Sequence, residues 1–343
     1  NIVLTVDEII QMFLEKALEE AYKEHNAIGS QGIVMDPSTG EILAVANYPD
    51  FDLNNPPRED METLQDLIKN KVFTDAYEPG STFKTVTAAS VLDSGAMTLD
   101  TNFNCVGYEI IDGQKIKCWR DYHPHGAQTF NEAVQNSCNP AFMNMALQMG
   151  TDVFYNYIYD FGFGSKTGVD VIYEGEGIVR NSKYIQRFDL ARIGFGQSVA
   201  VTPLQLINAV GTIVNGGELK RPMLVKELTD SKGNIVEEYK PETIRRVITE
   251  KTSNNMKEIL KRVVEEGSGK NAAIEGYSVG GKTGTAQKYD DEGKVMIGKN
   301  ISSFIGFAPV ENPELVVLIV VDEPSEGTSF GSIVAAPYVK EVL

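Results

Sequence analysis

The fold is indicated most directly by the stretch Glu78-Pro79-Gly80-Ser81-Thr82-Phe83-Lys84. Its Pro-Gly pair interrupts regular secondary structure, and an apolar helical segment starts directly after it and runs to about Asp93. Ser81 and Lys84 are three residues apart, so a helix places both side chains on one face, where the ammonium can meet the hydroxyl. The break puts Ser81 at the helix N-terminus, where free N–H groups and the helix dipole favour negative charge. Serine is a poor nucleophile until a base takes its proton, and this spacing supplies a candidate base.

Two further short motifs follow in order along the chain, Ser137-Cys138-Asn139 and Lys282-Thr283-Gly284-Thr285. A lysine that is desolvated beside a second lysine has a lowered pKa and can act as a base at neutral pH, which is the role expected for Lys84 next to Lys282. Ser137 could then relay the proton to a leaving amine, and Asn139 could hold a substrate amide.

The third motif offers the groups that a carboxylate-bearing substrate needs. Lys282 supplies a cation, Thr283 and Thr285 supply hydroxyls, and Gly284 permits close approach on an edge strand. The backbone N–H groups of Ser81 and Thr285 could form an oxyanion hole. The three motifs together predict a serine acyl-transfer site.

Each motif alone is a weak signal. About one Ser-x-x-Lys is expected by chance in a chain of this length. Ser253-Asn254-Asn255 also fits the second pattern, and Lys166-Thr167-Gly168 repeats the start of the third; we interpret these copies as a helix start and a turn. The ordered set, with each member in a suitable context, carries the prediction.

The composition sets the class of protein. The chain has 343 residues, 48 acidic and 31 basic side chains, a net charge of −17 and 42% hydrophobic residues. These values exclude a disordered chain and a disulfide-dense miniprotein, and the acidic balance argues against a nucleic-acid partner. The longest clean apolar run, Leu315 to Val321, is typical of a buried strand and too short to span a membrane.

The periodicity predicts one α+β domain whose sheet is completed from both ends of the chain. A helix is expected from Thr5 to Glu24, then a hairpin of Gly32–Met35 and Ile42–Ala46, and a polar, irregular connection over residues 51–76. Helices are expected in the middle of the chain, one of them closed by Gly150. The late strands are expected at Val279–Thr285, Ser302–Ala308 and Leu315–Val321.

With these motifs in place, the chain resembles the transpeptidase domain of class B penicillin-binding proteins, from Thr5-Val6-Asp7 to Ala336-Pro337. The resemblance extends to Asp36-Pro37-Ser38-Thr39-Gly40-Glu41-Ile42-Leu43-Ala44, Tyr77-Glu78-Pro79-Gly80, Gly194-Phe195-Gly196-Gln197 and Phe304-Ile305-Gly306-Phe307-Ala308-Pro309. The region from Cys118-Trp119 to Asn139-Pro140 is most similar to the sporulation-specific branch, the stage V sporulation protein D type. The resemblance implies a serine β-lactamase-like fold over residues 1–343, an antiparallel sheet flanked by helices with an all-helical subregion.

The resemblance also implies an activity. Ser81 would attack the penultimate D-Ala carbonyl of a peptidoglycan stem peptide, with Lys84 as base, and the amine of a neighbouring stem would resolve the acyl-enzyme in cell-wall or spore-cortex synthesis. β-Lactams would acylate Ser81, and no cofactor is required. A single-pass membrane anchor and a pedestal domain are expected outside this chain, with the catalytic domain extracytoplasmic and a membrane glycosyltransferase as partner.

Two other functions stay open for the same motifs. The first is a hydrolase of this fold, a β-lactamase or a D,D-carboxypeptidase. A class A β-lactamase needs a Glu-held water for deacylation, and no convincing Glu-x-x-Leu-Asn segment follows the second motif. The second is a β-lactam sensor, which is acylated and signals; such domains are shorter than this chain.

A cluster of cysteines and histidines lies close to the second motif in sequence. Thiolate, imidazole and carboxylate groups suit Zn²⁺, and we expect a structural or regulatory zinc held by Cys118, Asp121, His123, His125 and Cys138.

Other roles for these residues remain open. From the resemblance, Cys118 and Cys138 could instead be a redox-active thiol pair or a disulfide, and His125 a hydrogen-bonding structural residue. Cys105 is expected to be buried, and Trp119, the single tryptophan, to serve packing.

Overall fold

The computed structural model describes residues 1–289 and 294–343. The α-helices are α1 (Glu8–Glu24), α2 (Met61–Leu67), α3 (Lys71–Thr74), α4 (Lys84–Asp93), α5 (Phe130–Gln135), α6 (Asn139–Asp160), α7 (Arg187–Ile193), α8 (Pro203–Val214), α9 (Glu250–Glu265), α10 (Gly331–Val334) and α11 (Ala336–Val342). The strands are β1 (Ile2–Leu4), β2 (Gly29–Met35), β3 (Ile42–Tyr48), β4 (Asn102–Cys105), β5 (Tyr108–Ile111), β6 (Gln114–Lys117), β7 (Gly126–Thr129), β8 (Glu218–Lys220), β9 (Val225–Thr229), β10 (Ile235–Glu238), β11 (Thr243–Arg246), β12 (Gly280–Tyr289), β13 (Val295–Ala308) and β14 (Leu315–Asp322). Short 3₁₀ turns are η1 (Gly80–Phe83), η2 (Ser182–Tyr184) and η3 (Lys270–Ala272).

The central sheet draws its strands from both ends of the chain, as predicted. Its order is β12-β13-β14-β2-β3, and every pairing is antiparallel. Leu318 of the late strand β14 lies opposite Ile33 of the early strand β2. Because β14 is buried on both faces, its sequence is almost continuously apolar rather than alternating. Strand β2 has this character only over its last three residues, which are also buried.

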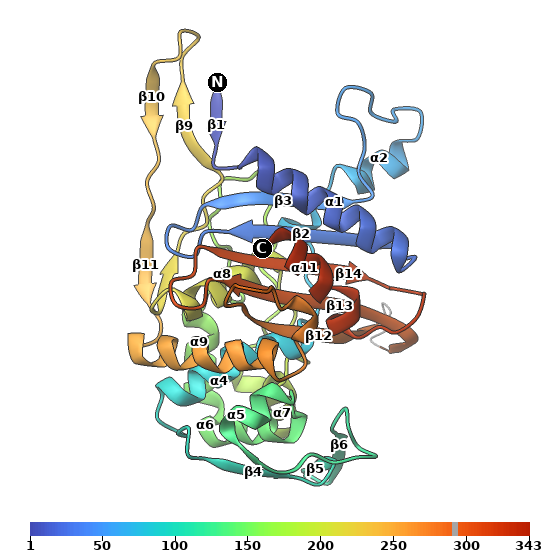
Figure 1. Cartoon of the computed structure of the whole chain (residues 1–343), viewed down its shortest axis with the longest axis vertical. Coiled ribbons are helices and arrows are strands. Elements are labelled where there is room, and N and C mark those ends of the chain that lie inside the picture. Colours follow the sequence, from blue (N-terminus) through green and yellow to red (C-terminus); the bar gives the residue numbers. More distant parts are fainter. Residues whose placement is uncertain (290–293) are drawn as a thin grey trace.

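Helices cover the two faces of this sheet (Figure 1). On one face, α1 and α11 pack on the strands and enclose a core that includes Leu14, Val34 and Val317. On the other face lie α8 and, behind it, the helical region with α4 to α7, which enclose the larger core. The expected α+β arrangement with an all-helical subregion is therefore confirmed.

Helix α1 differs from its prediction at its first turns. It begins at Glu8 rather than Thr5, because the Asp7 carboxylate caps it by accepting hydrogen bonds from the backbone N–H groups of Ile9 and Ile10. Only the later turns pack on the sheet, so Ile9 stays largely exposed, as does Phe13.

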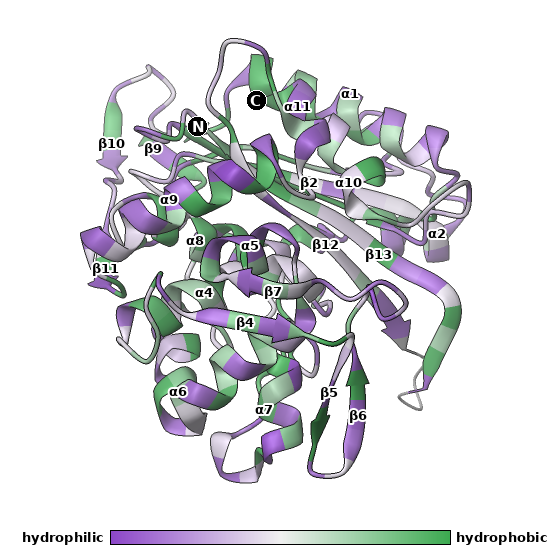
Figure 2. Cartoon of the chain, turned by 60° about the horizontal axis from the view of Figure 1, so that its bottom comes forward, coloured by the Kyte–Doolittle hydropathy of each residue, from purple (hydrophilic) through white to green (hydrophobic). Residues whose placement is uncertain are grey.

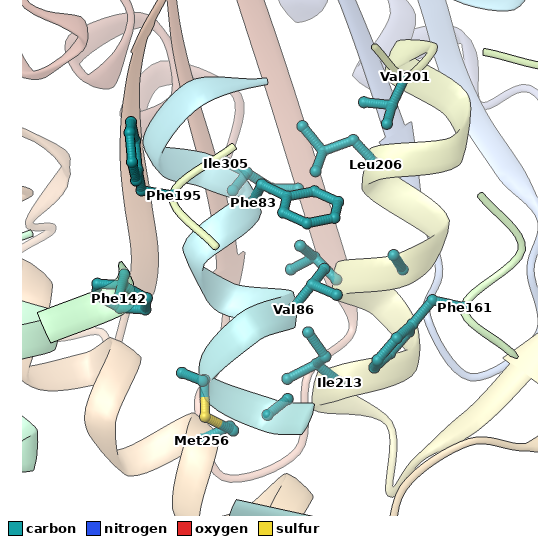
Figure 3. Packing of buried hydrophobic residues seen from close by; sticks show 14 of the residues in the cluster. Phe83, Val86, Phe142, Phe161, Phe195, Val201, Leu206, Ile213, Met256 and Ile305 are labelled. Atoms are coloured by element: carbon teal, nitrogen blue, oxygen red, sulfur yellow. The ribbon is translucent and has the colours of Figure 1, made fainter. Parts of the chain in front are cut away.

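The larger core forms around α4, the helix that begins with Lys84 of the first motif (Figure 3). Phe83 and Val86 point from this segment into a cluster that α8 completes with Leu206 and Ile213. Every residue of α8 is buried, which fits a helix that is apolar on all sides. This packing fixes the position of the helix that follows the nucleophile.

The regions on either side of α4 were only partly predicted. Residues 51–76, expected to be irregular, contain α2 and α3, whose N-caps are Asp60 and Asn70. Gly150 interrupts α6 with a φ of 75°, as expected of a residue that closes a helix. The β5–β6 hairpin projects from the helical region (Figure 2). No helix among residues 1–289 and 294–343 is long and apolar enough to cross a membrane.

Candidate active site

Ser81 lies in the turn η1, directly before α4, and is held against the edge of β12. The Gly80 N–H donates to Gly196 O at 3.0 Å. Gly80 has a φ of 54°, and a Cβ there would lie 2.8 Å from Thr285 O, so only glycine allows this approach. Thr82 Oγ1 donates to Pro79 O at 2.7 Å and closes the turn. The turn predicted at Pro79-Gly80 therefore places Ser81 next to β12, the strand that carries Lys-Thr-Gly-Thr.

Lys84 is fully buried one turn after Ser81 and reaches the second motif. Its Nζ donates to Ser137 O at 2.8 Å, to Ser137 Oγ at 3.0 Å and to Asn139 Oδ1 at 2.7 Å. Ser137 has a φ of 50°, a left-handed conformation that is uncommon for a residue with a side chain and occurs mostly where tertiary contacts enforce it. The first two motifs are thus brought together.

Lys282 reaches the same hydroxyl from the opposite side. Its Nζ donates to Ser137 Oγ at 3.0 Å and to Thr283 Oγ1 at 3.3 Å, and the side chain is fully buried. Burial lowers the pKa of Lys84 to about 7, whereas the nearby Cys118 and Cys138 act in the opposite direction. Burial, with the charge of Lys84, also holds the pKa of Lys282 well below its usual range. The Ser137 hydroxyl therefore bridges two amines, of which one can be neutral at neutral pH.

A pocket of about 360 Å³ opens onto these groups. It is lined by Gly80, Ser81, Trp119, Ser137, Asn139, Phe195, Gln197, Ser268, Thr283, Thr285, Phe330, Gly331 and Ser332. All three motifs contribute to this wall, and in the part of the chain that the structure describes no carboxylate lines it. The Ser268 hydroxyl lies 3.3 Å from Thr283 Oγ1, and the Thr285 hydroxyl accepts from the Gly331 N–H at 3.2 Å.

Trp119, expected to serve packing, packs against Phe330 and also lines this pocket. Its side chain is 51% exposed, and its ring stands edge-on to Phe330 with centroids 6.4 Å apart. The indole N–H donates to Asn136 O at 3.0 Å, which ties the ring to the residue before Ser137. No sequence signal marked Phe330 or Ser268, because neither belongs to a short motif.

The structure gathers only part of the predicted metal set. Cys118, His125 and Cys138 join Cys105, and their ligand atoms lie within 4.8 Å of one another. Asp121 and His123 are outside this group: the Asp121 carboxylate pairs with Lys117 at 2.8 Å, and the His123 side chain is exposed. Cys105 enters because β4 pairs with β7, which sets Cys105 opposite Gly126, next to His125.

The four-residue group adjoins the second motif through Cys138; its three cysteines are buried and His125 is half-buried. All three cysteines are free thiols, and Cys118 Sγ lies 3.7 Å from His125 Nδ1. Hydrogen bonds from Cys138 and His125 lower the pKa of Cys118, whereas hydrogen bonding to Cys118, together with burial, raises that of Cys138. His125 Nε2 is buried without a hydrogen-bond partner among the described residues. The donor set therefore fits a soft divalent ion such as Zn²⁺.

Comparisons with known proteins identify the class. The family described as penicillin binding protein transpeptidase domain matches residues 32–343, and the chain belongs to this family. It is 41% identical to stage V sporulation protein D of Bacillus subtilis over 99% of its own length and 52% of that relative. It is 30% identical to peptidoglycan D,D-transpeptidase FtsI of Escherichia coli over 98% of its length and 54% of that relative. The chain thus spans about half the length of these curated relatives.

Solved structures agree with this assignment. The transpeptidase domain of penicillin-binding protein 3 from Burkholderia pseudomallei matches with a TM-score of 0.84 and 30% identity, over 99% of this chain and 93% of that one. Penicillin-binding protein 3 from Mycobacterium tuberculosis, complexed with aztreonam, matches with a TM-score of 0.89 and 28% identity over 99% of this chain and 77% of that one. The fold and family predicted from the three motifs are confirmed.

Proposed function

We propose that the chain is the catalytic domain of a serine D,D-transpeptidase that cross-links peptidoglycan stem peptides through an acyl-enzyme on Ser81. One observation carries this proposal: Lys84 and Lys282 donate to the same Ser137 hydroxyl in the wall of the pocket that Ser81 lines. The names of the relatives, peptidoglycan D,D-transpeptidase among them, support it. A role in spore-cortex synthesis is supported by the identity to the sporulation protein.

In the proposed mechanism, neutral Lys84 removes the proton of Ser81 as Oγ attacks the penultimate D-Ala carbonyl. The oxyanion is bound by the backbone N–H groups of Ser81 and Thr285. The Ser137 hydroxyl passes a proton to the leaving D-alanine amine, and the bridging position between two amines allows it to be reprotonated. The terminal carboxylate is bound by the hydroxyls of Thr283 and Thr285, which line the pocket, with Lys282 buried behind Thr283 as the nearby cation when it is protonated. The amine of a second stem peptide then attacks the acyl-enzyme and releases Ser81.

Intact-protein mass after incubation with a penicillin tests the proposal. An adduct equal to one whole penicillin that persists for many minutes is expected in the wild type, and none in Ser81→Ala. Incubation with a D-Ala-D-Ala peptide and an amine acceptor should then yield the exchanged peptide. A wild type that stays unmodified at saturating penicillin would contradict the assignment of Ser81.

The rival functions predict other outcomes. A β-lactamase deacylates quickly and leaves no lasting adduct, but it needs a base to activate water, and no carboxylate lines the pocket in the described part of the chain. A D,D-carboxypeptidase would release D-alanine without exchange to an amine. A β-lactam sensor would be acylated by penicillin and ignore the D-Ala-D-Ala peptide.

We extend the proposal to the cellular setting. A membrane anchor outside this chain would hold the catalytic domain on the extracytoplasmic side, where its stem-peptide substrate lies, next to a glycosyltransferase that supplies the glycan strand. The family membership supports this setting, and a membrane-fractionation experiment on the full-length protein tests it. A full-length protein that stays in the soluble fraction would overturn it.

We further propose that Cys105, Cys118, His125 and Cys138 hold one zinc ion of structural or regulatory use. The buried and unpartnered His125 Nε2 and the three free thiols fit such an ion. Zinc would cross-link β4, the loop before β7 and the start of α6, and acyl transfer needs no step through it. A disulfide between Cys118 and Cys138 is the alternative.

Native mass and metal analysis distinguish these outcomes with two matched histidine variants. His125→Ala should lose the zinc and melt at a lower temperature, whereas His123→Ala should retain one zinc per chain. Absence of metal in the wild type, with a mass two daltons below that of the reduced chain, would replace the zinc with a disulfide. Retention of zinc in His125→Ala would remove His125 from the ligand set.

A further inference from the structure

A second pocket, of about 280 Å³, lies over strands β2 and β14 of the central sheet. Its floor includes Gln31 of β2 and Val320 of β14, which lie opposite each other in the sheet. Val320 in turn pairs with Ser303 of β13, and Ser303 pairs with Gly284 of β12. Directly paired residues point to the same face, so Gln31, Val320 and Ser303 lie in one row across the sheet, which ends at Gly284 of the third catalytic motif.

The two pockets share the segment that carries the nucleophile. Tyr77 and Ala76 line the second pocket, while Gly80 and Ser81 line the catalytic one. Tyr77 is held in place by paired backbone hydrogen bonds with Val201, at 3.0 and 2.9 Å. A molecule in the second pocket therefore contacts a residue four positions before Ser81.

Two polar atoms of residues that line this pocket are buried without a hydrogen-bond partner among the described residues: Gln31 Oε1 and Asp322 Oδ1, of which the second also lies in an ion pair with Lys288. Tyr77, which also lines the pocket, is 8% exposed; burial raises its pKa, whereas a hydrogen bond with the Ser303 side chain acts in the opposite direction. Buried polar atoms in native proteins almost always have a partner. A donor placed in the pocket would satisfy Gln31 Oε1 and the Asp322 carboxylate.

The charges of the pocket select the kind of molecule. Three ion pairs line it: Lys69–Asp75 at 2.6 Å, Lys71–Asp66 at 3.2 Å and Lys288–Asp322 at 3.0 Å. Cations and anions are balanced, so a net anion such as a phosphate ester gains nothing here, whereas a molecule with one charge of each sign can contact both. The volume lies below the range of drug-sized ligand sites.

We infer that this pocket is a second ligand site, for a zwitterion of amino-acid or dipeptide size, and that its occupancy alters the acylation of Ser81 through the Tyr77–Ser81 segment. The ammonium of the ligand donates to Gln31 Oε1 and the Asp322 carboxylate, and its carboxylate faces the lysines. D-Alanine is the first probe, because the proposed transpeptidation releases it, and to that extent the choice of probe rests on the proposed function.

The test is calorimetric titration of D-alanine and D-alanyl-D-alanine into protein whose Ser81 has first been acylated with penicillin, so that the catalytic pocket is filled. Saturable binding of one molecule is expected, about tenfold weaker in Gln31→Leu and in Tyr77→Phe. Acetate and ethylamine, with one charge each, should bind more weakly than D-alanine. The control Gln114→Leu makes the same change on the exposed β5–β6 hairpin and should bind as the wild type does.

Absence of saturable binding to the wild type would show that the pocket holds solvent only and would overturn the inference. Equal binding by Gln31→Leu, Tyr77→Phe and the wild type would place the ligand elsewhere and overturn it as well. Penicillin acylation rates measured with and without D-alanine test the coupling, which an unchanged wild-type rate overturns. If penicillin never acylates Ser81, the proposed function fails, and the Gln31 and Tyr77 variants still decide the second site by titration of the unmodified protein.

Discussion

The Ser137 hydroxyl has an unusual place for a serine: two buried amines donate to it, and its backbone is held at a φ of 50°. Two charged ammonium groups around one hydroxyl in a buried site would repel each other, and burial already disfavours each charge. The protonation state of the Lys84–Lys282 pair therefore determines whether the site contains a base.

Replacing Lys84 by methionine should slow penicillin acylation of Ser81 by about 10²–10⁴-fold, the usual contribution of a general base. Methionine fills a similar volume in this buried position, so the fold should be retained. Stopped-flow or mass-resolved acylation rates measure the effect. Lys166→Met, in the exposed second Lys-Thr-Gly copy, is the matched control and should acylate normally; an active Lys84→Met enzyme would assign the base to another group.

The acylation rate should also depend on pH through Lys84. Burial lowers its pKa to about 7, so the amine is mostly charged below that pH and mostly neutral above it. Because the neutral form is the base, the rate constant should rise with pH and be half-maximal near that value. We expect this profile in metal-free protein, where no ion is bound to the neighbouring thiols. An acylation rate that is flat from about pH 6 to 8 would contradict the role of Lys84 as base.

Among the elements, the turn η1 shows how far local sequence determines the site. Its glycine approaches β12 closely, and the facing Gly196, with a φ of 84°, would place a Cβ against Gly80 O. The Pro79-Gly80 pair allowed this turn to be predicted from the sequence. The contact with Gly196 was not visible, because it joins residues more than a hundred positions apart.

Gly196→Ala should therefore impair both stability and chemistry. The left-handed φ alone costs about 1–2 kcal/mol for a residue with a side chain, and the added Cβ displaces η1 from β12, so acylation should also slow. Gly233→Ala is the matched control: its φ is also 84°, but a Cβ there meets nothing within 4 Å. Denaturant unfolding together with acylation rates separates the two effects; equal acylation by both variants would mean that η1 tolerates displacement.

Residues of the site that are placed by local sequence could be predicted, whereas residues placed by contacts between distant segments could not. Ser81 and Lys84 could be placed by helical spacing, and the sheet by its apolar runs. The predicted metal ligands were chosen because they are close in sequence, so the set included Asp121 and His123. It left out Cys105, because the β4–β7 pairing that brings Cys105 next to His125 has no local signal in the sequence. The place of Trp119 in the pocket wall was not predicted for the same reason: its partner Phe330 lies at the far end of the chain.

At the scale of the whole molecule, the sheet makes the fold one cooperative unit. Strand β2 from the start of the chain pairs with β14 from its end, and β12, which carries the third motif, joins through β13. The third catalytic motif thus lies in the sheet itself, and the first two lie on η1, α4 and the start of α6. Loss of the pairing between β2 and β14 should therefore remove the site and the fold together.

Ile33→Ala and Leu318→Ala test this coupling, since the two residues are fully buried and lie opposite each other in β2 and β14. Each should lower the free energy of unfolding by about 2–5 kcal/mol, the usual cost of such a cavity. Because they are in contact, the double variant should depart from additivity by about 0.5–3 kcal/mol. Thermal unfolding should show a single transition in all three, and penicillin acylation should be lost over the same temperature range. Two separate transitions, or acylation that survives the loss of β2–β14 pairing, would show instead that the helical region folds and works independently of the sheet.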